Sequence, residues 1–183
     1  MLAGGKSSRM GRDKALLPHG EGSLAGHLAA AVAAAAGSVA LIGDPEKYAQ
    51  LGYQVLPDRR PGAGPLGGIE SALCYTAADW NLILACDMPR MQTEFLRGLL
   101  EAAEREDADA LLPAGPSGRP EPLSAVYHRR CLAPLRRALD DGVRKVTAAL
   151  AGLSVRAWSV ADDAWFENLN TPEEWASYRH DSH

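Results

Sequence analysis

The chain has 183 residues, a length that fits one domain of ordinary size. Hydrophobic residues make up 46% of the chain and charged residues 23%, a composition that supports a packed core and excludes a disordered protein. The formal net charge is -4, whereas proteins that bind nucleic acid in bulk are usually basic; local cations on an acidic chain suit a small anionic ligand better.

The first third of the chain alternates between strand and helix signals. Residues 1–3 have the character of a strand end. The Ala-rich segment 23–37 predicts a helix, with Ser23 as its N-cap and Gly37 just past its end. Three further elements are predicted in order: a strand at 38–43, a short helix at 45–52 and a strand at 53–57.

The middle of the chain contains the most hydrophobic strand candidate. Segment 81–86, NLILAC, is expected to lie centrally in a parallel sheet, buried on both faces. It follows a Gly- and Pro-rich loop at 58–68 and a helix predicted at 69–78. A helix at 93–106 and a strand at 109–115 come next.

In the last third, Thr171, Pro172 and Glu174 fit the N-cap, N1 and N3 positions of a final helix within 168–179. The preceding elements are predicted as a strand at 122–128, helices at 130–142 and 143–152, and a strand at 153–160. This alternation predicts an α/β fold: a single three-layer αβα domain over 1–183, with a mostly parallel, Rossmann-like sheet and some mixed strands.

Two features of the sequence point to one edge of that sheet. The glycine loop at 4–14 follows the first strand stub, and Asp87 follows the most buried strand. Ligands of open α/β sheets bind at the carboxyl ends of the strands. We therefore expect both features to open at the same edge.

The glycine loop, GGKSSRMGRDK, has the composition of a phosphate-binding loop. Glycines allow backbone N–H groups to converge on phosphate oxygens, and Arg9 and Lys14 add charge-assisted hydrogen bonds. The loop matches neither the Walker pattern nor the Rossmann pattern G-x-G-x-x-G. Taken alone, the residues leave a phosphate loop and a solvated glycine-rich loop equally open.

Six segments in order resemble nucleotidyltransferases of the nucleotide-diphospho-sugar transferase fold, and among these the molybdenum cofactor guanylyltransferases most. The segments are LAGGKSSRMGRDK (2–14), LPD (56–58), GPLGGI (64–69), CDMP (86–89), PLSAVY (122–127) and NLNTPEEW (168–175). Relatives usually carry several apolar residues before LAGG. The first strand is therefore expected to be very short, or the recorded start lies inside the natural protein.

The resemblance implies a role for each matching residue. The first loop would hold a nucleoside triphosphate, and Asp58 would contact the nucleotide. Asp87 would bind Mg²⁺, and Asn168 and Asn170 match paired asparagines, with Asn170 as a second metal ligand. Arg9, Lys14 and Asp87 would form the catalytic set. The residues assigned to nucleotide binding are Leu2, Ala3, Gly4, Gly5, Lys14, Asp58 and Asp87, with guanine near the first three.

The implied reaction joins the phosphate of molybdopterin to the α-phosphorus of GTP and releases pyrophosphate. The attacking phosphate oxygen is already ionised at neutral pH, so no general base is needed. The expected partners are GTP and the molybdenum cofactor, with transient contact with other cofactor-maturation proteins and with neither nucleic acid nor membrane. A cytidylyltransferase, a sugar-phosphate nucleotidyltransferase or a non-catalytic nucleotide-binding module remain as alternatives.

The cysteines indicate a reducing compartment. Cys74, Cys86 and Cys131 are odd in number and widely spaced, so they form neither a disulfide framework nor a CxxC metal pair. No apolar run has the roughly 18 residues of a membrane-spanning helix. We therefore expect a cytoplasmic protein, and we expect Cys86, beside Asp87, to be a small core residue.

Overall fold

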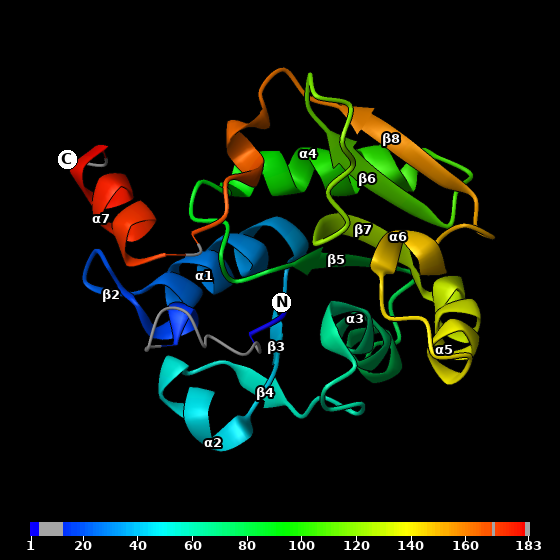
Figure 1. Ribbon diagram of the computed structural model, residues 1–183, viewed down its shortest axis with the longest axis horizontal. Helices are drawn as coiled ribbons and strands as arrows, with labels where there is room; N and C mark the ends of the chain where they lie inside the picture. The colour runs from blue at the N-terminus through cyan, green and yellow to red at the C-terminus, as the bar shows by residue number, and fades with distance from the viewer. Residues whose placement is uncertain (4–12, 170, 182–183) are drawn as a thin grey trace.

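The computed structural model describes residues 1–3, 13–169 and 171–181 and has the predicted α/β architecture (Figure 1). The strands are β1 (Pro18–His19), β2 (Gly22–Ser23), β3 (Ala40–Ile42), β4 (Gln54–Leu56), β5 (Trp80–Leu84), β6 (Ala110–Ala114), β7 (Ser124–His128) and β8 (Val155–Ser159). The α-helices are α1 (Leu24–Ala36), α2 (Pro45–Tyr48), α3 (Gly64–Tyr75), α4 (Thr93–Glu104), α5 (Leu132–Asp140), α6 (Val146–Ala149) and α7 (Pro172–Asp181). The 3₁₀ helices are η1 (Lys14–Leu16), η2 (Ala49–Leu51), η3 (Arg129–Cys131) and η4 (Asp163–Phe166).

Residues 1–3 form the central link of the sheet. Leu2 bridges Ile42 of β3 and Ala85 just after β5, in parallel on both sides. The Leu2 amide donates to Leu84 O at 2.8 Å, and the Leu2 carbonyl accepts from Cys86 N at 3.2 Å. On the other side, Ala3 N donates to Ile42 O at 2.9 Å. Three residues thus connect β3 and β4 with the other half of the sheet.

The sheet is mixed, and its strands follow the order β4-β3-(1–3)-β5-β7-β6-β8. β7 is antiparallel to both of its neighbours, whereas β6 and β8 are parallel, as are β3 and β4. The central position of β5 is confirmed, but the expectation that it lies among parallel strands is wrong on the β7 side. Because β7 alone runs in the opposite direction, the carboxyl ends of the other strands in this sheet still lie at one edge.

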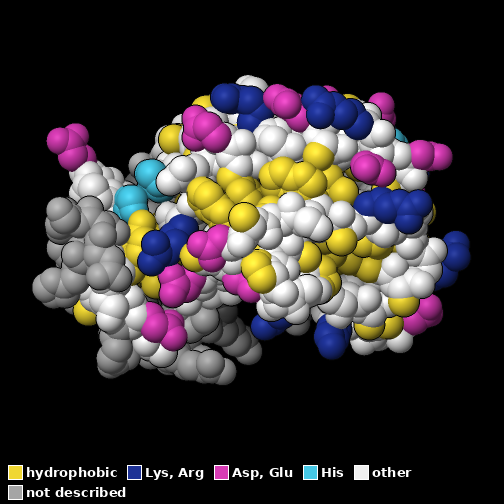
Figure 2. Space-filling view, turned by 90° about the horizontal axis from the view of Figure 1, so that it is seen from above, with side chains coloured by type: hydrophobic (Ala, Val, Ile, Leu, Met, Phe, Trp, Pro, Cys, Tyr) yellow, Lys and Arg dark blue, Asp and Glu magenta, His cyan; other side chains and the backbone are white. Residues whose placement is uncertain are grey.

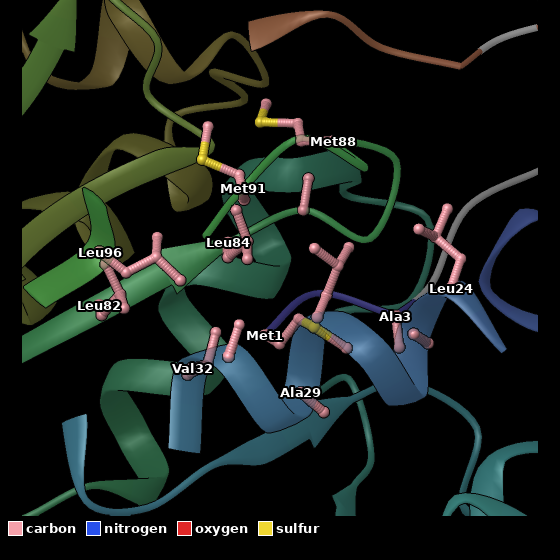
Figure 3. Packing of buried hydrophobic residues seen from close by; sticks show 14 of the residues in the cluster. Met1, Ala3, Leu24, Ala29, Val32, Leu82, Leu84, Met88, Met91 and Leu96 are labelled. Atoms are coloured by element: carbon pink, nitrogen blue, oxygen red, sulfur yellow. The ribbon is translucent and has the colours of Figure 1, made fainter. Parts of the chain in front are cut away.

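Helices cover both faces of the sheet and complete a three-layer arrangement. Side chains of β5 alternate between the faces: Leu82 and Leu84 pack with α1 and α4, and Ile83 packs with α3 and α5. Figure 1 shows α3 and α5 next to each other on their side of β5. The central segment follows the same alternation. Figure 3 shows Met1 and Ala3 beside α1, whereas Leu2 packs on the other face.

The predicted helix ends are confirmed where a side chain makes the cap. Ser23 Oγ accepts from Gly26 N at 3.2 Å at the start of α1, and Gly37 ends that helix with φ 79°. Before α7, Glu174 N donates to Thr171 Oγ1 at 3.2 Å, and Thr171 N donates to Glu174 Oε2 at 3.0 Å. This reciprocal pair is the predicted capping box.

Other boundaries differ from the prediction. α3 begins at Gly64, so part of the predicted 58–68 loop is helical. Pro65 lies in its first turn, where a missing N–H costs nothing, and Gly68 allows the close approach of Leu2. A Cβ at Gly68 would come 3.1 Å from Leu2 Cδ2. The β1–β2 hairpin and η4 were not predicted, and the helix predicted at 143–152 is reduced to α6.

An aromatic cluster lies between α4, β8 and η4. The Phe95 ring lies 5.3 Å from that of Trp158, 5.0 Å from that of Trp165 and 6.1 Å from that of Phe166.

In the view from above, the surface carries a band of apolar side chains with acidic and basic groups around it (Figure 2). Among the helices that the structure describes, none has the length and apolar character to cross a bilayer.

Leu2→Ala should destabilise the fold by about 2–5 kcal/mol, the usual range when a buried leucine is truncated. Leu2 is 8% exposed and connects the central segment to α3, so its loss leaves a cavity between them. Urea-induced unfolding measures the difference. Leu153→Ala, at a half-buried position after α6, is the control and should cost clearly less. Equal losses would contradict the central role of Leu2.

Candidate functional site

Asp87 lies in a tight turn at the carboxyl end of β5. The turn is held on both sides, since Ala85 N donates to Leu123 O at 2.7 Å and Cys86 N donates to Leu2 O. Met88 and Met91 follow it and are buried, at 1% and 0% exposure. Figure 3 shows them with Leu84 at the end of β5. The buried methionines anchor the turn, so that Asp87 is presented at the sheet edge by a fixed backbone.

Lys14 approaches Asp87 from the end of the glycine loop. It opens η1, whose first turn is capped by Asp13, because Asp13 Oδ1 accepts from Ala15 N at 3.0 Å. Lys14 Nζ lies 3.8 Å from Asp87 Oδ2. The side chains are 18% and 27% exposed, so this pair is partly shielded from solvent. The prediction that the loop and Asp87 open at the same edge is therefore confirmed for Lys14.

Among the described residues, the groups around Asp87 do not fully compensate its charge. Burial raises the pKa of Asp87 above the ordinary aspartate range, although the Lys14 ammonium acts in the opposite direction. At 3.8 Å the two groups attract each other without a close hydrogen bond. A further cation at this carboxylate would therefore be favoured.

The NLN segment near the C-terminus is also held at this turn. Leu169 N donates to the Asp87 carbonyl at 3.0 Å, and the Leu169 side chain is 3% exposed. Asn168 precedes this anchor, so its backbone lies next to the Asp87 turn. Asn170 is outside the described residues.

Tyr178 of α7 bridges the segments that follow Lys14 and Asp87. Its hydroxyl donates to the Pro89 carbonyl at 3.3 Å and lies 3.1 Å from His19 Nε2. The Arg90 guanidinium lies over the same ring at 5.9 Å. The last helix thus fastens the β1 strand to the Asp87 loop and limits their relative movement.

The other residues assigned to the nucleotide are placed only in part. Gly4, Gly5 and Arg9 are outside the described residues. Leu2 and Ala3 are described, with both side chains buried in the core, and the Leu2 backbone paired with the β5 segment. Any contribution of these two residues to a base site would come from the position of their backbone.

Asp58 lies beyond the end of β4, at the same edge of the sheet. Its Oδ1 accepts from Arg60 N at 2.9 Å and from Ser71 Oγ at 2.9 Å. The Ser71 hydroxyl in turn accepts from Arg59 N at 2.8 Å. These bonds fix the loop that leads into α3. They give Asp58 a structural role, and its contact with a nucleotide remains a prediction.

Glu121 is a site residue that the sequence analysis missed. β5 and β7 pair in the register Leu84↔Ser124, and the bond from Ala85 N to Leu123 O continues this pairing. Beyond this bond both segments turn, and Glu121 comes close enough to Asp87 for the two carboxylates to interact. Burial raises the pKa of Glu121, and the negative charge of Asp87 contributes in the same direction. Glu121 reaches this edge because β7 is antiparallel to β5, and no local sequence pattern reveals that pairing.

Cys86 packs against the hydrophobic core, as the sequence predicted, but it is half-buried and not fully enclosed. Burial raises the pKa of its thiol to about 12, and the Asp87 carboxylate adds to the shift. A thiol with this pKa is protonated at neutral pH and is a poor nucleophile. The chemistry available at this edge is therefore electrostatic, provided by an ammonium group and carboxylates at the ends of rigid strands.

Comparison with known proteins places the chain among nucleotidyltransferases. The model of the "MobA-like NTP transferase domain" family matches residues 1–155. A probable molybdenum cofactor guanylyltransferase of Carboxydothermus hydrogenoformans is 33% identical over 183 residues, which cover 96% of this chain and 91% of that protein.

Solved structures show the same similarity. Molybdopterin-guanine dinucleotide biosynthesis protein A from Archaeoglobus fulgidus superposes with a TM-score of 0.81 at 26% identity, covering 99% of this chain and 96% of that one. A CMP:2-keto-3-deoxy-manno-octonic acid synthetase complexed with CTP has a TM-score of 0.76 at 16% identity, with 98% and 94% coverage. The second similarity concerns the fold alone.

Substitution of the two aspartates should change stability in opposite directions. At neutral pH, in buffer with a chelator, Asp87→Asn should be more stable than the parent chain, because a raised folded-state pKa means that ionisation destabilises the fold. Asp13→Asn should be less stable, because hydrogen bonds hold the pKa of Asp13 below its usual range.

Both differences should shrink as the pH falls. The cost of ionised Asp87 disappears when the pH falls below its raised pKa and then below the ordinary aspartate range. The stabilisation from Asp13 is lost as the pH falls through its lowered pKa. Thermal unfolding across this pH range measures both effects, and shifts of the same sign in the two variants would contradict the analysis.

Proposed function

Since the chain belongs to the family of MobA-like NTP transferase domains, we propose that it is a molybdenum cofactor guanylyltransferase. It transfers GMP from GTP to the phosphate of molybdopterin and releases pyrophosphate. The observation that carries the proposal is the Lys14 ammonium 3.8 Å from Asp87 at the carboxyl edge of the sheet. The proposal includes a single domain over 1–183. It also includes a cytoplasmic location, which the three free cysteines support.

The reaction needs positioning and charge neutralisation more than proton transfer. A molybdopterin phosphate oxygen forms a bond to the α-phosphorus of GTP, and the bond to the bridging oxygen breaks with its electron pair on pyrophosphate. Lys14 donates hydrogen bonds to the phosphoryl oxygens whose negative charge grows during transfer. The loop backbone from Gly5 to Lys14, with Arg9, holds the triphosphate so that the reacting atoms are in line.

Asp87 has the properties of a magnesium ligand. Its carboxylate is a hard oxygen donor, and its pKa is raised because the cost of burial outweighs the attraction of Lys14. No group of three or more His, Cys, Asp or Glu suited to a metal occurs among the described residues, and Mg²⁺ commonly takes one or two carboxylates plus phosphate oxygens and water. Mg²⁺ bound here would neutralise triphosphate charge. Asp87 would hold it, with Asn170 as second ligand.

The choice of GTP over CTP rests on the family relationship. The fold alone is shared with a synthetase that binds CTP, so the architecture does not distinguish the bases. The chain has LAGG at 2–5, as guanylyl-transferring relatives do, and Gly4 allows a purine to approach the backbone closely because it has no Cβ. A cytidylyltransferase or a sugar-phosphate nucleotidyltransferase is the alternative.

The deciding experiment supplies molybdenum cofactor and Mg²⁺ with each of GTP, CTP, ATP and UTP. Base-labelled transfer and pyrophosphate release should be greatest with GTP. Asp87→Ala should abolish both, because the metal and its charge compensation are lost, while Asp107→Ala, at a fully exposed position, should behave as the parent chain. A preference for CTP would overturn the guanylyltransferase assignment, and full activity of Asp87→Ala would overturn the metal assignment.

Lys14→Ala should reduce kcat by about 100-fold or more, roughly 3 kcal/mol, the usual effect of one charge contact made in the transition state. Arg9→Ala should have a similar or smaller effect. Steady-state pyrophosphate release measures both, with Arg105→Ala, on the exposed end of α4, as the control. Normal turnover in both loop variants would show that the phosphates bind elsewhere.

A further inference from the structure

Tyr48 makes a long-range contact with the loop that carries Lys14. It is the last residue of α2, and its side chain is 2% exposed. Its hydroxyl donates to Asp13 Oδ2 at 2.7 Å, across 35 positions of the chain. Burial raises the pKa of the Tyr48 hydroxyl, and the bond to Asp13 adds to this. The hydroxyl is therefore a permanent donor at physiological pH.

Asp13 links this contact to the backbone of Lys14. Its Oδ1 accepts from Ala15 N at 3.0 Å and so caps the turn in which Lys14 lies. Its Oδ2 accepts from Tyr48 and forms an ion pair with Lys47 Nζ. Burial alone would raise the pKa of Asp13, but the bonds from Lys47, Tyr48 and Ala15 together lower it. The carboxylate stays ionised, with both oxygens engaged.

The local sequence is arranged to place the Tyr48 ring at this point. Asp44 caps α2, because its Oδ1 accepts from Glu46 N at 3.0 Å and from Lys47 N at 3.3 Å. Gly43 precedes this cap, and a Cβ there would come 2.8 Å from Tyr48 Cε2. Any other residue at 43 would displace the Tyr48 ring from its position next to Asp13. α2 and the turn before it thus deliver one aromatic side chain to Asp13.

We propose that Tyr48 is a positioning residue for Lys14 and acts through Asp13; the inference rests on the proposed function of Lys14. A lysine side chain is long and flexible, so the direction of its ammonium depends on the backbone from which it starts. The Tyr48–Asp13 bond fixes that backbone relative to the sheet, because α2 follows directly from β3. It keeps Lys14 Nζ within 3.8 Å of Asp87, where the phosphates of the nucleotide would lie.

Tyr48→Phe removes the hydroxyl and keeps the ring. We expect kcat for GMP transfer to fall about tenfold, the scale of one hydrogen bond to a charged group, with KM for GTP changed less than about twofold. Tyr75→Phe is the matched control, since its hydroxyl donates to the Pro57 carbonyl at 3.2 Å on the surface. It should leave kcat unchanged.

The same substitution in a Lys14→Ala background distinguishes positioning from stability. If Tyr48 acts through Lys14, Tyr48→Phe should lower kcat in the parent chain but have no further effect once Lys14 is gone. A merely structural role would lower kcat in both backgrounds, and this outcome overturns the proposal. An unchanged kcat in the parent chain also overturns it, even where Lys14→Ala shows the loss of kcat that the proposed function requires.

The experiments also distinguish failure of the proposed function from failure of the positioning role of Tyr48. Normal turnover of Lys14→Ala removes the catalytic role of Lys14, and with it any positioning role of Tyr48. Circular dichroism checks that each variant is folded, so that kcat refers to folded protein. If Tyr48→Phe does not fold, Asp13→Asn tests the same relay. It should lower kcat in the parent chain and not in the Lys14→Ala background, and equal effects in both backgrounds again overturn the proposal.

Discussion

The structure depends on three central residues that must be hydrogen-bonded on both sides and packed on both faces. Leu2 pairs with the β5 segment, while Met1 and Ala3 pair with β3. Buried backbone groups need such partners, and the amides of Leu2 and Ala3 and the carbonyls of Met1 and Leu2 all find one in a neighbouring strand segment. The side chains divide between the two cores in the same way. Loss of register here would separate β3 and β4 from the rest of the sheet.

The central segment also determines where the chemistry takes place. Because the central segment is parallel to β3 and β5, Ala3 at its end, Gly43 after β3 and Asp87 after β5 lie at one edge of the sheet. The turns at this edge are built differently. The Asp87 turn rests on buried methionines, whereas the Lys14 turn rests on polar contacts from α2. A site between them can therefore combine a fixed carboxylate with a cation whose direction is set by side-chain hydrogen bonds.

The sequence predicted those parts of the fold in which the cause is local. Ser23 and the Thr171–Glu174 pair define helix starts through side chains within a few residues of the backbone they cap. The antiparallel insertion of β7 is a non-local pairing, and no pattern within 122–128 distinguishes it from a parallel strand. GPLGG was interpreted as loop because glycine and proline usually interrupt helices. Here Pro65 lies in the first turn, and Gly68 provides space for Leu2, a residue 66 positions earlier.

The same distinction between local and non-local causes applies to the candidate site. Lys14 and Asp87 were predicted, since each belongs to a motif that resembles a known family, and the sheet brings them together. Tyr48 and Glu121 were missed, because their importance comes from partners at Asp13 and Asp87 that only the fold supplies. Gly4, Gly5, Arg9 and Asn170 lie outside the described residues, so their assignments rest on the resemblance alone.

The two aspartates at this edge show how the fold separates support from chemistry. Asp13 receives a hydroxyl, an ammonium and a backbone amide, and these donors lower its pKa. Among the described residues, Asp87 faces the Lys14 ammonium at 3.8 Å and lies near Glu121, and burial raises its pKa. A carboxylate that the fold has fully satisfied stabilises a turn, whereas an undercompensated one attracts a cation. Under the proposed function, the triphosphate would add further negative charge beside Asp87 and Glu121, and a metal ion bound with the nucleotide would offset that charge.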